Sequence, residues 1–330
     1  MNPTWKIVRG QTGFGLVELM IAMTIGLVLL GGIGYLYLGS RGAFRTTDNL
    51  SRMQENARYA LDMMSRDIRM AGYLGCGNLQ STRVNTIANP PVPPMNPGNA
   101  LIGYSGGAGW TNPSTIAKVP NTDVISIMAA WSSGVNLTGN VTPQNANIQV
   151  GSNPDGFQAG DVLVVTNCVN ADVFRATSVS TSSGTIITLA HSSSNNSSNW
   201  VGSYGKDAFV LKVNQYSYFI GTNPAGNPAL YRTGINGNAE ELVENVQNLQ
   251  IRYGLDTNGD GAVDSYSTTP TNWPQVVSVT LNLLMRSPDD NISTSVQTPR
   301  FDNATFTAPD RRLYQVYSAT VGVRNRIPPM

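Results

Sequence analysis

The feature that most constrains this chain is an apolar run near its N-terminus, residues 14–38, in which Glu18 is the single charged side chain. As a helix the run measures about 38 Å at a rise of 1.5 Å per residue, enough to span a bilayer with some tilt. Before it, residues 1–13 hold Lys6 and Arg9 and no acid, and positive charge keeps the adjoining end in the cytoplasm. We therefore expect one membrane pass, with the remainder of the chain exported.

An ordinary secretory signal is the alternative interpretation of this run. Such signals have an apolar region of about 7 to 15 residues followed by a small-x-small cleavage site. Ser40 and Gly42 offer a weak site of that kind, but the run is too long for it. A membrane anchor fits the length better.

Glu18 points beyond a simple anchor. An ionised carboxylate among lipid tails costs several kcal/mol unless it finds a partner, and the run contains no Lys or Arg. Cleavage after Gly13 would supply one, because the new α-amino group of Phe14 lies one helical turn before Glu18. The amine of a neighbouring copy would serve as well. We therefore interpret the apolar run as an interface for assembly with neighbouring copies.

The stretch GFGLVE, beginning at Gly13, resembles the N-terminal motif of type IV pilins and pseudopilins. These proteins combine a short basic leader, cleavage after Gly before an N-methylated Phe or Met, Glu at the fifth mature position and a long apolar helix. Gly15 departs mildly from the usual Thr or Ser. The resemblance implies removal of residues 1–13 by a prepilin peptidase in the inner membrane, methylation of Phe14 and helix packing through Glu18.

The helix is expected to continue as an amphipathic segment over residues 39–72. Apolar residues recur there at steps of three and four, which predicts one buried face packed on the protein's own sheet rather than a ligand groove. Gly72 is the expected terminator. The residues of this predicted face are Leu50, Met53, Ala57, Leu61, Met64 and Ile68.

Residues 73–330 are expected to form a β-rich head, because short apolar runs alternate there with turn-forming residues. We predict an α+β fold: a long N-terminal helix, with a transmembrane half and an amphipathic half, packed on a mainly antiparallel sheet as in pilins. The expected strands lie within residues 123–131, 160–167, 171–180, 185–190, 208–221, 249–255, 276–285 and 312–325.

The two cysteines, Cys76 and Cys168, both fall in the exported portion, where oxidation is favoured. We expect a disulfide between them, with two free buried thiols as the alternative. Charged residues make up only 12% of the chain and the formal net charge is +1. That balance gives no indication of direct nucleic-acid binding.

A calcium loop is predicted in DTNGDGAVDSYS, residues 256–267. Alternate positions carry oxygen ligands around a glycine turn at Gly261, in the order that calcium loops use. Ser267 departs from the bidentate acid expected at the twelfth position. The alternative is an Asp/Gly-rich turn between two strands. The expected ligands are Asp256, Asn258, Asp260, the carbonyl of Ala262, and Asp264.

No enzyme is indicated by the sequence. It contains no phosphate-binding loop, no H-E-x-x-H and no dinucleotide fingerprint. A Ser/His/Asp arrangement would have to use His191, which lies in a Ser/Asn-rich loop without a nucleophile motif and is expected to be exposed.

Several blocks resemble the PilW family of minor pilins: residues 54–78, the GDVLVVTNCVNADVFRATSV block, the ELVENVQNLQIRYGLDTNGDGAVDSY block and residues 311–326. The resemblance implies a minor pilin that joins other minor pilins and the major pilin, primes type IV pilus assembly and sits at the pilus tip, in twitching motility, adhesion or DNA uptake. It implies residence in the inner membrane with the head in the periplasm, then on the pilus at the cell surface.

Two other functions remain open from sequence. One is a large minor pseudopilin of a type II secretion system, which shares the helix and the class. The other is a membrane-anchored extracytoplasmic adhesin or sugar-binding module, with a platform built from Trp110, Trp131, Trp200 and Trp273.

Overall fold

The computed structural model describes residues 13, 15–76, 79, 81–89, 93, 95–96, 98–183, 185–199 and 201–326. The chain divides into two compact units, Met1–Ser51 and Arg52–Met330. The first contains the N-terminal part of the single long helix. The second, called the head below, contains the rest of that helix and all the strands.

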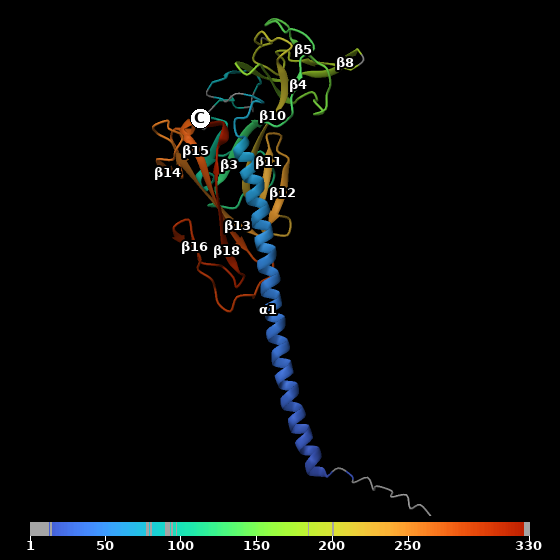
Figure 1. Ribbon diagram of the computed structural model, residues 1–330, viewed down its shortest axis with the longest axis vertical. Helices are drawn as coiled ribbons and strands as arrows, with labels where there is room; N and C mark the ends of the chain where they lie inside the picture. The colour runs from blue at the N-terminus through green and yellow to red at the C-terminus, as the bar shows by residue number, and fades with distance from the viewer. Residues whose placement is uncertain are drawn as a thin grey trace, which may run out of the picture. The chain divides into compact units, whose positions relative to one another are not determined.

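Helix α1 runs from Leu16 to Met70 without a break (Figure 1), through the glycines that dot its apolar half. It ends as the sequence predicts. Gly72 has a φ of +75°, a left-handed conformation that glycine adopts at no steric cost. Its N–H donates to the carbonyl of Met128, 2.9 Å away, and the Asn325 side chain donates to the Ala71 carbonyl at 3.1 Å. The helix end is thereby hydrogen-bonded to the head.

The larger sheet of the head has nine strands, with the main order β1-β7-β6-β10-β11-β12; β2 and β3 form a branch on β10, and β4 also pairs with β10. Its pairs are antiparallel except β1 with β7. The strands are β1 Arg83–Thr86, β2 Leu101–Tyr104, β3 Val124–Ala130, β4 Val135–Asn136, β6 Val162–Thr166, β7 Asn170–Arg175, β10 Phe209–Thr222, β11 Pro228–Gly234 and β12 Ala239–Glu244.

Strand β10 links two parts of the head. Its first residues, 209–212, pair with β6, whereas residues 213–218 pair with β3 and residues 216–222 pair with β11. A separate three-stranded sheet, β5-β9-β8, lies near β4 at one end of the head (Figure 1). Its strands are β5 Asn147–Val150, β8 Ser178–Ser183 and β9 Ile186–Ala190.

The C-terminal part of the chain forms a four-stranded antiparallel sheet in the order β14-β13-β15-β18. A two-stranded ribbon, β16-β17, lies in the connection between β15 and β18. The strands are β13 Val246–Leu255, β14 Ser265–Ser267, β15 Val276–Arg286, β16 Arg300–Phe301, β17 Ala304–Thr305 and β18 Tyr314–Gly322. Short 3-10 turns span Ser105–Gly107, Trp273–Gln275 and Arg324–Arg326.

One hydrophobic core joins the end of α1, residues 52–70, to both large sheets. The helix contributes side chains that are at most 1% exposed: Met53, Ala57, Ala60, Met64 and Ile68. They pack with side chains of β3 and β10 from one sheet, and of β13 and β15 from the other. The predicted buried face is therefore confirmed at four of its six positions, while Leu50 and Leu61 are only partly buried.

The predicted fold class, α+β with a mainly antiparallel head, is confirmed. Each predicted strand region contains a strand, although residues 171–180 hold nearly all of β7 and the start of β8 instead of one strand. Several strands were not predicted, and β11 and β12 are the longest of them. β11 begins at a proline, and β12 carries the sequence AEELVE, in which Val243 is the single β-branched residue and no residue is aromatic. The sheet pairing in the folded head outweighs those weak local preferences.

Candidate functional site

The N-terminal end of α1 holds the predicted processing and assembly site. Gly13 is exposed. Phe14 and most of the predicted leader, residues 1–12, lie outside the described residues. The helix begins at Leu16 and places Glu18 in its first turn.

Glu18 is held locally at the helix start. The backbone N–H of Gly15 donates to its Oε2 at 3.1 Å, which satisfies one of the N–H groups that a helix leaves unpaired at its N-terminus. A negative charge in the first turn is also favoured by the helix dipole. The carboxylate is exposed, so its second oxygen is accessible to a cation from another molecule.

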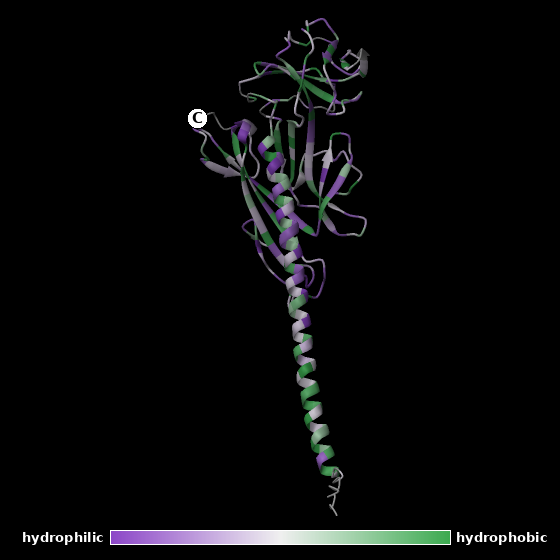
Figure 2. Ribbon diagram, turned by 45° about the vertical axis from the view of Figure 1, so that its right-hand side comes forward, coloured by the Kyte–Doolittle hydropathy of each residue, from purple (hydrophilic) through white to green (hydrophobic). Residues whose placement is uncertain are grey.

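The helix that follows exposes apolar side chains on all sides, and its hydropathy colouring is largely green (Figure 2). Leu16, Leu27 and Tyr35 are 77%, 70% and 80% exposed, and α1 contains a window with a mean hydropathy of 2.3, long enough to cross a membrane. A soluble helix buries such residues or does not carry them. This surface requires lipid or the helices of other subunits as its environment.

Inside the head, a buried carboxylate fixes the end of α1 to the large sheet. The Tyr218 hydroxyl of β10 donates a short hydrogen bond to Asp67, and the Arg232 guanidinium of β11 lies 3.7 Å from the same carboxylate. Burial raises the pKa of Asp67, while Tyr218 and Arg232 act in the opposite direction. Arg232 also pairs with Glu240 at 3.0 Å and stacks over the Tyr216 ring at 4.7 Å.

Sequence reasoning did not identify Asp67 or Arg232. Asp67 stands on the helix among other charged residues, and only its helical position next to the buried face, one residue before Ile68, marks it as an inward-facing acid. Its partners come from strands more than 150 residues away. No local pattern connects the two.

The predicted disulfide between Cys76 and Cys168 is confirmed. The two residues are 92 positions apart, with Cα atoms separated by 5.3 Å. Cys76 follows the end of α1, and Cys168 lies in the turn between β6 and β7 with a φ of +71°. The Thr82 hydroxyl donates to the Cys168 carbonyl at 3.1 Å. The bond joins the exit of the helix to the β6–β7 hairpin.

The predicted calcium loop connects β13 to β14, as the alternative turn interpretation also required. The carboxylate oxygens of Asp256 accept the N–H groups of Gly259 and Gly261 at 2.6 and 2.8 Å. Asp264 accepts both the N–H and the hydroxyl of Thr257 at 2.7 Å, which lowers the pKa of Asp264. These N–H and O–H groups stabilise much of the negative charge in the loop by hydrogen bonding.

The Asn258 amide nitrogen lies between the other acidic side chains of the loop, 3.1 Å from Asp260 and 3.4 Å from Asp264. Within the described part of the chain, no group of three or more His, Cys, Asp or Glu side chains is arranged to hold a metal ion. Calcium at this loop stays a prediction.

His191 is completely buried, so the expectation of an exposed loop residue is wrong. Its ring lies 5.1 Å from that of Phe174, next to the core of the β5-β9-β8 lobe. Burial lowers its pKa, and the charge of Asp172 partly offsets that effect. The Ser and Asn residues around His191 are typical of an exposed loop, and this composition does not reveal that the His191 side chain points inward.

The predicted tryptophan platform is not formed by the tryptophans that the structure describes. Trp131 packs on Tyr216, Trp273 packs on Tyr253, and Trp110 packs on Phe219. Trp131 and Trp273 border the main core, whereas Trp110 belongs to a separate small cluster. Trp200 lies outside the described residues.

Two family models match this chain. The model described as Type IV Pilus-assembly protein W, PilW, matches residues 217–325, from within β10 to the turn after β18. The prokaryotic N-terminal methylation motif matches residues 8–34, which include Gly13, Phe14 and Glu18. The chain matches a PilW-like minor pilin. No curated protein and no solved structure matches it.

These matches imply processing by a prepilin peptidase and assembly with other pilins. The methylation motif and the single long apolar helix fit a pilin anchored in the inner membrane. The match to PilW covers the four-stranded sheet with β11 and β12, while β1 to β9 and both cysteines lie outside it.

Proposed function

We propose that this protein is a minor pilin that co-assembles with other minor pilins, primes assembly of a type IV pilus and sits at its tip. The head would lie in the periplasm before assembly and at the cell surface afterwards. The observation that carries the proposal is the exposed apolar helix with Glu18 in its first turn, in register with the methylation motif. The family match to PilW favours the pilus over a type II secretion system.

The mechanism we propose depends on a charge pair that forms after processing. Cleavage after Gly13 creates an amine at Phe14, and this amine, or that of a neighbouring pilin, pairs with Glu18 in the membrane. Two opposite charges gain far more from pairing in lipid than in water, because the low dielectric strengthens their attraction. The pair would set the axial register of neighbouring helices, and the apolar side chains would then pack against each other.

A tip position is consistent with the size of the head. The unit Arg52–Met330 holds two large sheets and the additional β5-β9-β8 lobe around the end of one helix. A head of this size is hard to repeat in every layer of a filament, whereas a tip subunit has neighbours on one side only. Twitching motility, adhesion and DNA uptake are the processes that such a tip would serve.

The decisive experiment replaces Glu18 with Ala or Gln in the native host. We expect loss of this subunit from sheared pili and at least a severalfold fall in pilus number by electron microscopy. Glu55→Ala is the matched control, because Glu55 is an exposed carboxylate on the same helix. Normal pilus number with the variant incorporated would refute the proposal, as would a mature protein that still begins at Met1 in mass spectrometry. Loss of protein secretion with normal pili would transfer the protein to a type II secretion system.

We also propose that the loop at residues 256–267 binds calcium, with rotation of the Asn258 amide exposing the carboxylates of Asp260 and Asp264 to the ion. The spacing of the oxygen ligands supports this. Isothermal titration of the full-length protein in detergent should give calcium heat that disappears in Asp260→Ala. Asp290→Ala, in the exposed β15–β16 connection, is the control. Absence of calcium heat in the unmodified protein would refute the site.

A further inference from the structure

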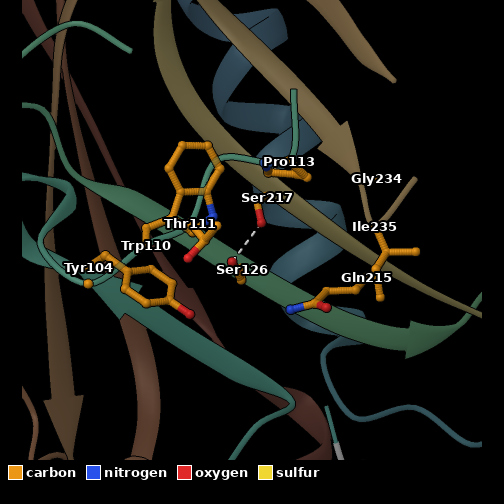
Figure 3. A pocket seen from close by; sticks show the side chains of 10 residues that line it. Tyr104, Trp110, Thr111, Pro113, Ser126, Gln215, Ser217, Gly234 and Ile235 are labelled. Atoms are coloured by element: carbon orange, nitrogen blue, oxygen red, sulfur yellow. Dashed lines mark hydrogen bonds between the residues drawn. The ribbon is translucent and has the colours of Figure 1, made fainter. Parts of the chain in front are cut away.

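The two faces of the β3–β10 pair differ sharply in chemistry. On one face Ile127 and Tyr218 enter the core shared with α1. On the other, Ser126 and Ser217 stand directly opposite each other in register. This second face is covered by the segment that follows β2, and a cavity of about 280 Å³ lies between the segment and the strands (Figure 3).

The floor of the cavity is polar although it is built into a sheet. Ser126 and Ser217 are 2% and 7% exposed, and their Oγ atoms are 2.6 Å apart. A buried hydroxyl without a partner is costly, and each of these serines satisfies the other. A hydroxyl can donate once and accept twice, so the pair retains hydrogen-bonding capacity toward the cavity. Gln215, two residues before Ser217 on the same face, adds an amide that can donate and accept.

One wall is aromatic and well supported. Trp110 lines the cavity and rests against Phe219, with ring centroids 5.0 Å apart, and Tyr104 stands beside it. The connection after Trp110 is braced by Asn112, whose amide donates to the Ile116 carbonyl at 2.8 Å and accepts from Ser114. An aromatic ring held in this way offers a binding surface that needs little ordering when a ligand arrives.

The opposite wall is the turn after β11, beginning at Gly234 and Ile235. The two walls touch each other. At Gly237, which has a φ of +80°, an added Cβ atom would lie 2.4 Å from the carbonyl oxygen of Pro113. The cavity is therefore bounded by backbone segments in contact and does not depend on one side chain alone.

No Asp, Glu, Lys or Arg side chain is among the described residues that line the cavity. Its groups are hydroxyls, one amide and aromatic rings, which suit a neutral ligand carrying hydroxyl groups and C–H faces. Its volume of about 280 Å³ lies just below the usual range for ligand sites, about 300–1,000 Å³, so the ligand is small. We propose that this cavity binds a single neutral sugar residue, with its ring on Trp110 and its hydroxyls on Ser126, Ser217 and Gln215.

The polar floor distinguishes this site from a groove for a peptide or a lipid chain. An acyl chain offers no hydrogen bonds, so it would cover the Gln215 amide and the remaining hydrogen-bonding capacity of the two hydroxyls without compensation, which costs binding energy. A peptide strand would need a free sheet edge, but β10 is paired on both sides next to the cavity, with β3 and β11. A hydroxylated ring satisfies the floor and covers the aromatic wall at once.

The test uses the full-length mature protein in a zwitterionic detergent that has no sugar headgroup, since alkyl glycosides would compete. Neutral hexoses and N-acetylhexosamines are titrated while tryptophan fluorescence and calorimetry are recorded. The same sugars are then presented as terminal residues of immobilised oligosaccharides. We expect saturable binding with a dissociation constant of about 1 mM or below for the free sugar. Tighter binding to the immobilised form alone would mark a surface glycan as the source.

Two variants locate the site. Trp110→Ala should weaken binding at least about tenfold, and Gln215→Ala about three- to tenfold, because they remove the stacking surface and one hydrogen-bonding group. Trp131→Ala and Gln250→Ala are matched controls, since both residues lie outside the cavity and should leave affinity unchanged. Gln215 is partly exposed, so its variant tests the site even where Trp110→Ala fails to fold.

Absence of saturable binding by every neutral sugar overturns the proposal. Unchanged sugar affinity in the two folded single variants, Gln215→Ala and Trp110→Ala, also overturns the proposal, because the sugar then binds elsewhere. Capture of a peptide in place of a sugar by the same cavity overturns it as well. The outcome is separable from the assembly role: the sugar site can fail while Glu18 variants still lose pili, and the reverse also holds.

Discussion

The two parts of α1 use apolar side chains in opposite ways. Along residues 16–44 of the N-terminal unit, large apolar side chains are exposed around the whole circumference, with Leu29 and Leu36 at 61% and 71%. Along residues 52–70 one apolar stripe is at most 1% exposed, and most of the charged residues lie on the remaining faces; the stripe consists of Met53, Ala57, Ala60, Met64 and Ile68. A stripe can be covered by a protein's own sheets, whereas an apolar surface on all sides needs lipid or other helices.

The acidic residues of the two parts of α1 also differ in where their partners lie. Asp67 finds Tyr218 and Arg232 inside the same chain. Glu18 accepts the N–H of Gly15, and among the described residues it makes no ion pair. The acid of the amphipathic part thus finds its partners within the fold, whereas an ion-pair partner for Glu18 is expected only under the proposed assembly.

The largest expected effect comes from truncating the buried stripe. Met64→Ala should lower the free energy of unfolding of the head by about 2–5 kcal/mol, because Met64 is fully buried between the helix and both sheets. Leu27→Ala is the control and should change it by no more than about 0.5 kcal/mol. Denaturation of the full-length protein in detergent, followed by tryptophan fluorescence, measures both. Equal losses of unfolding free energy in Met64→Ala and Leu27→Ala would contradict the contrast between the two parts of α1.

The disulfide should come next in size. Replacing Cys76 and Cys168 together by Ser should cost the head about 2–4 kcal/mol, since the bond closes a long loop in the unfolded chain. Reducing agent should bring the unmodified protein to the same midpoint and leave the double variant unchanged. If reduction shifts neither protein, the link between helix exit and hairpin contributes nothing to stability.

The buried acid of the helix should matter more than an exposed one. Asp67→Ala should cost about 2 kcal/mol, because it leaves the Tyr218 hydroxyl without its acceptor. Asp62→Ala should stay within about 0.5 kcal/mol, since Asp62 and Arg66 form an ion pair whose side chains are both more than 70% exposed. Asp67→Asn should cost less than Asp67→Ala, because an amide oxygen still accepts from Tyr218. The ranking is read from the same denaturation curves.

The smallest effect concerns mild acid. The pKa of buried His191 is lowered in the folded head, so the unfolded chain binds a proton first as the pH falls below about 6.5. His191 therefore favours folding above that pH, and this contribution should be lost progressively from about pH 6.5 toward the lower folded pKa. Residues 16–51 contain no histidine and should show no such dependence. His191→Leu should flatten the pH profile of unfolding between pH 7 and 5; an unchanged profile would assign the effect to other groups.

The part of the fold that could be predicted is the part with a strong local pattern. The helical stripe, the Gly72 terminator and strands rich in Val, Ile and Leu such as β13 and β15 follow from periodicity and composition. β11 and β12 could not be found that way, because their pairing partners supply the stability that their own residues lack. The contacts of Asp67 with Tyr218 and Arg232, and the burial of His191, likewise depend on residues distant in sequence.

The candidate assembly site could be proposed from sequence for a different reason. Gly13, Phe14, Glu18 and the apolar run form one short linear segment, which the methylation motif matches within residues 8–34. The cavity beside Trp110 was not predictable, because its residues come from β2, β3, β10 and the turn after β11.

By itself, the sequence determined that this chain has one membrane-length helix with an acid at its start, an amphipathic continuation and a β-rich head with two cysteines. Each of these follows from residue spacing along a few turns or from composition. Tertiary structure alone decided how strands far apart pair, which polar side chains become buried, and which face of the β3–β10 pair holds a cavity. Those outcomes depend on contacts between distant segments, and packing energy exists only once the segments meet.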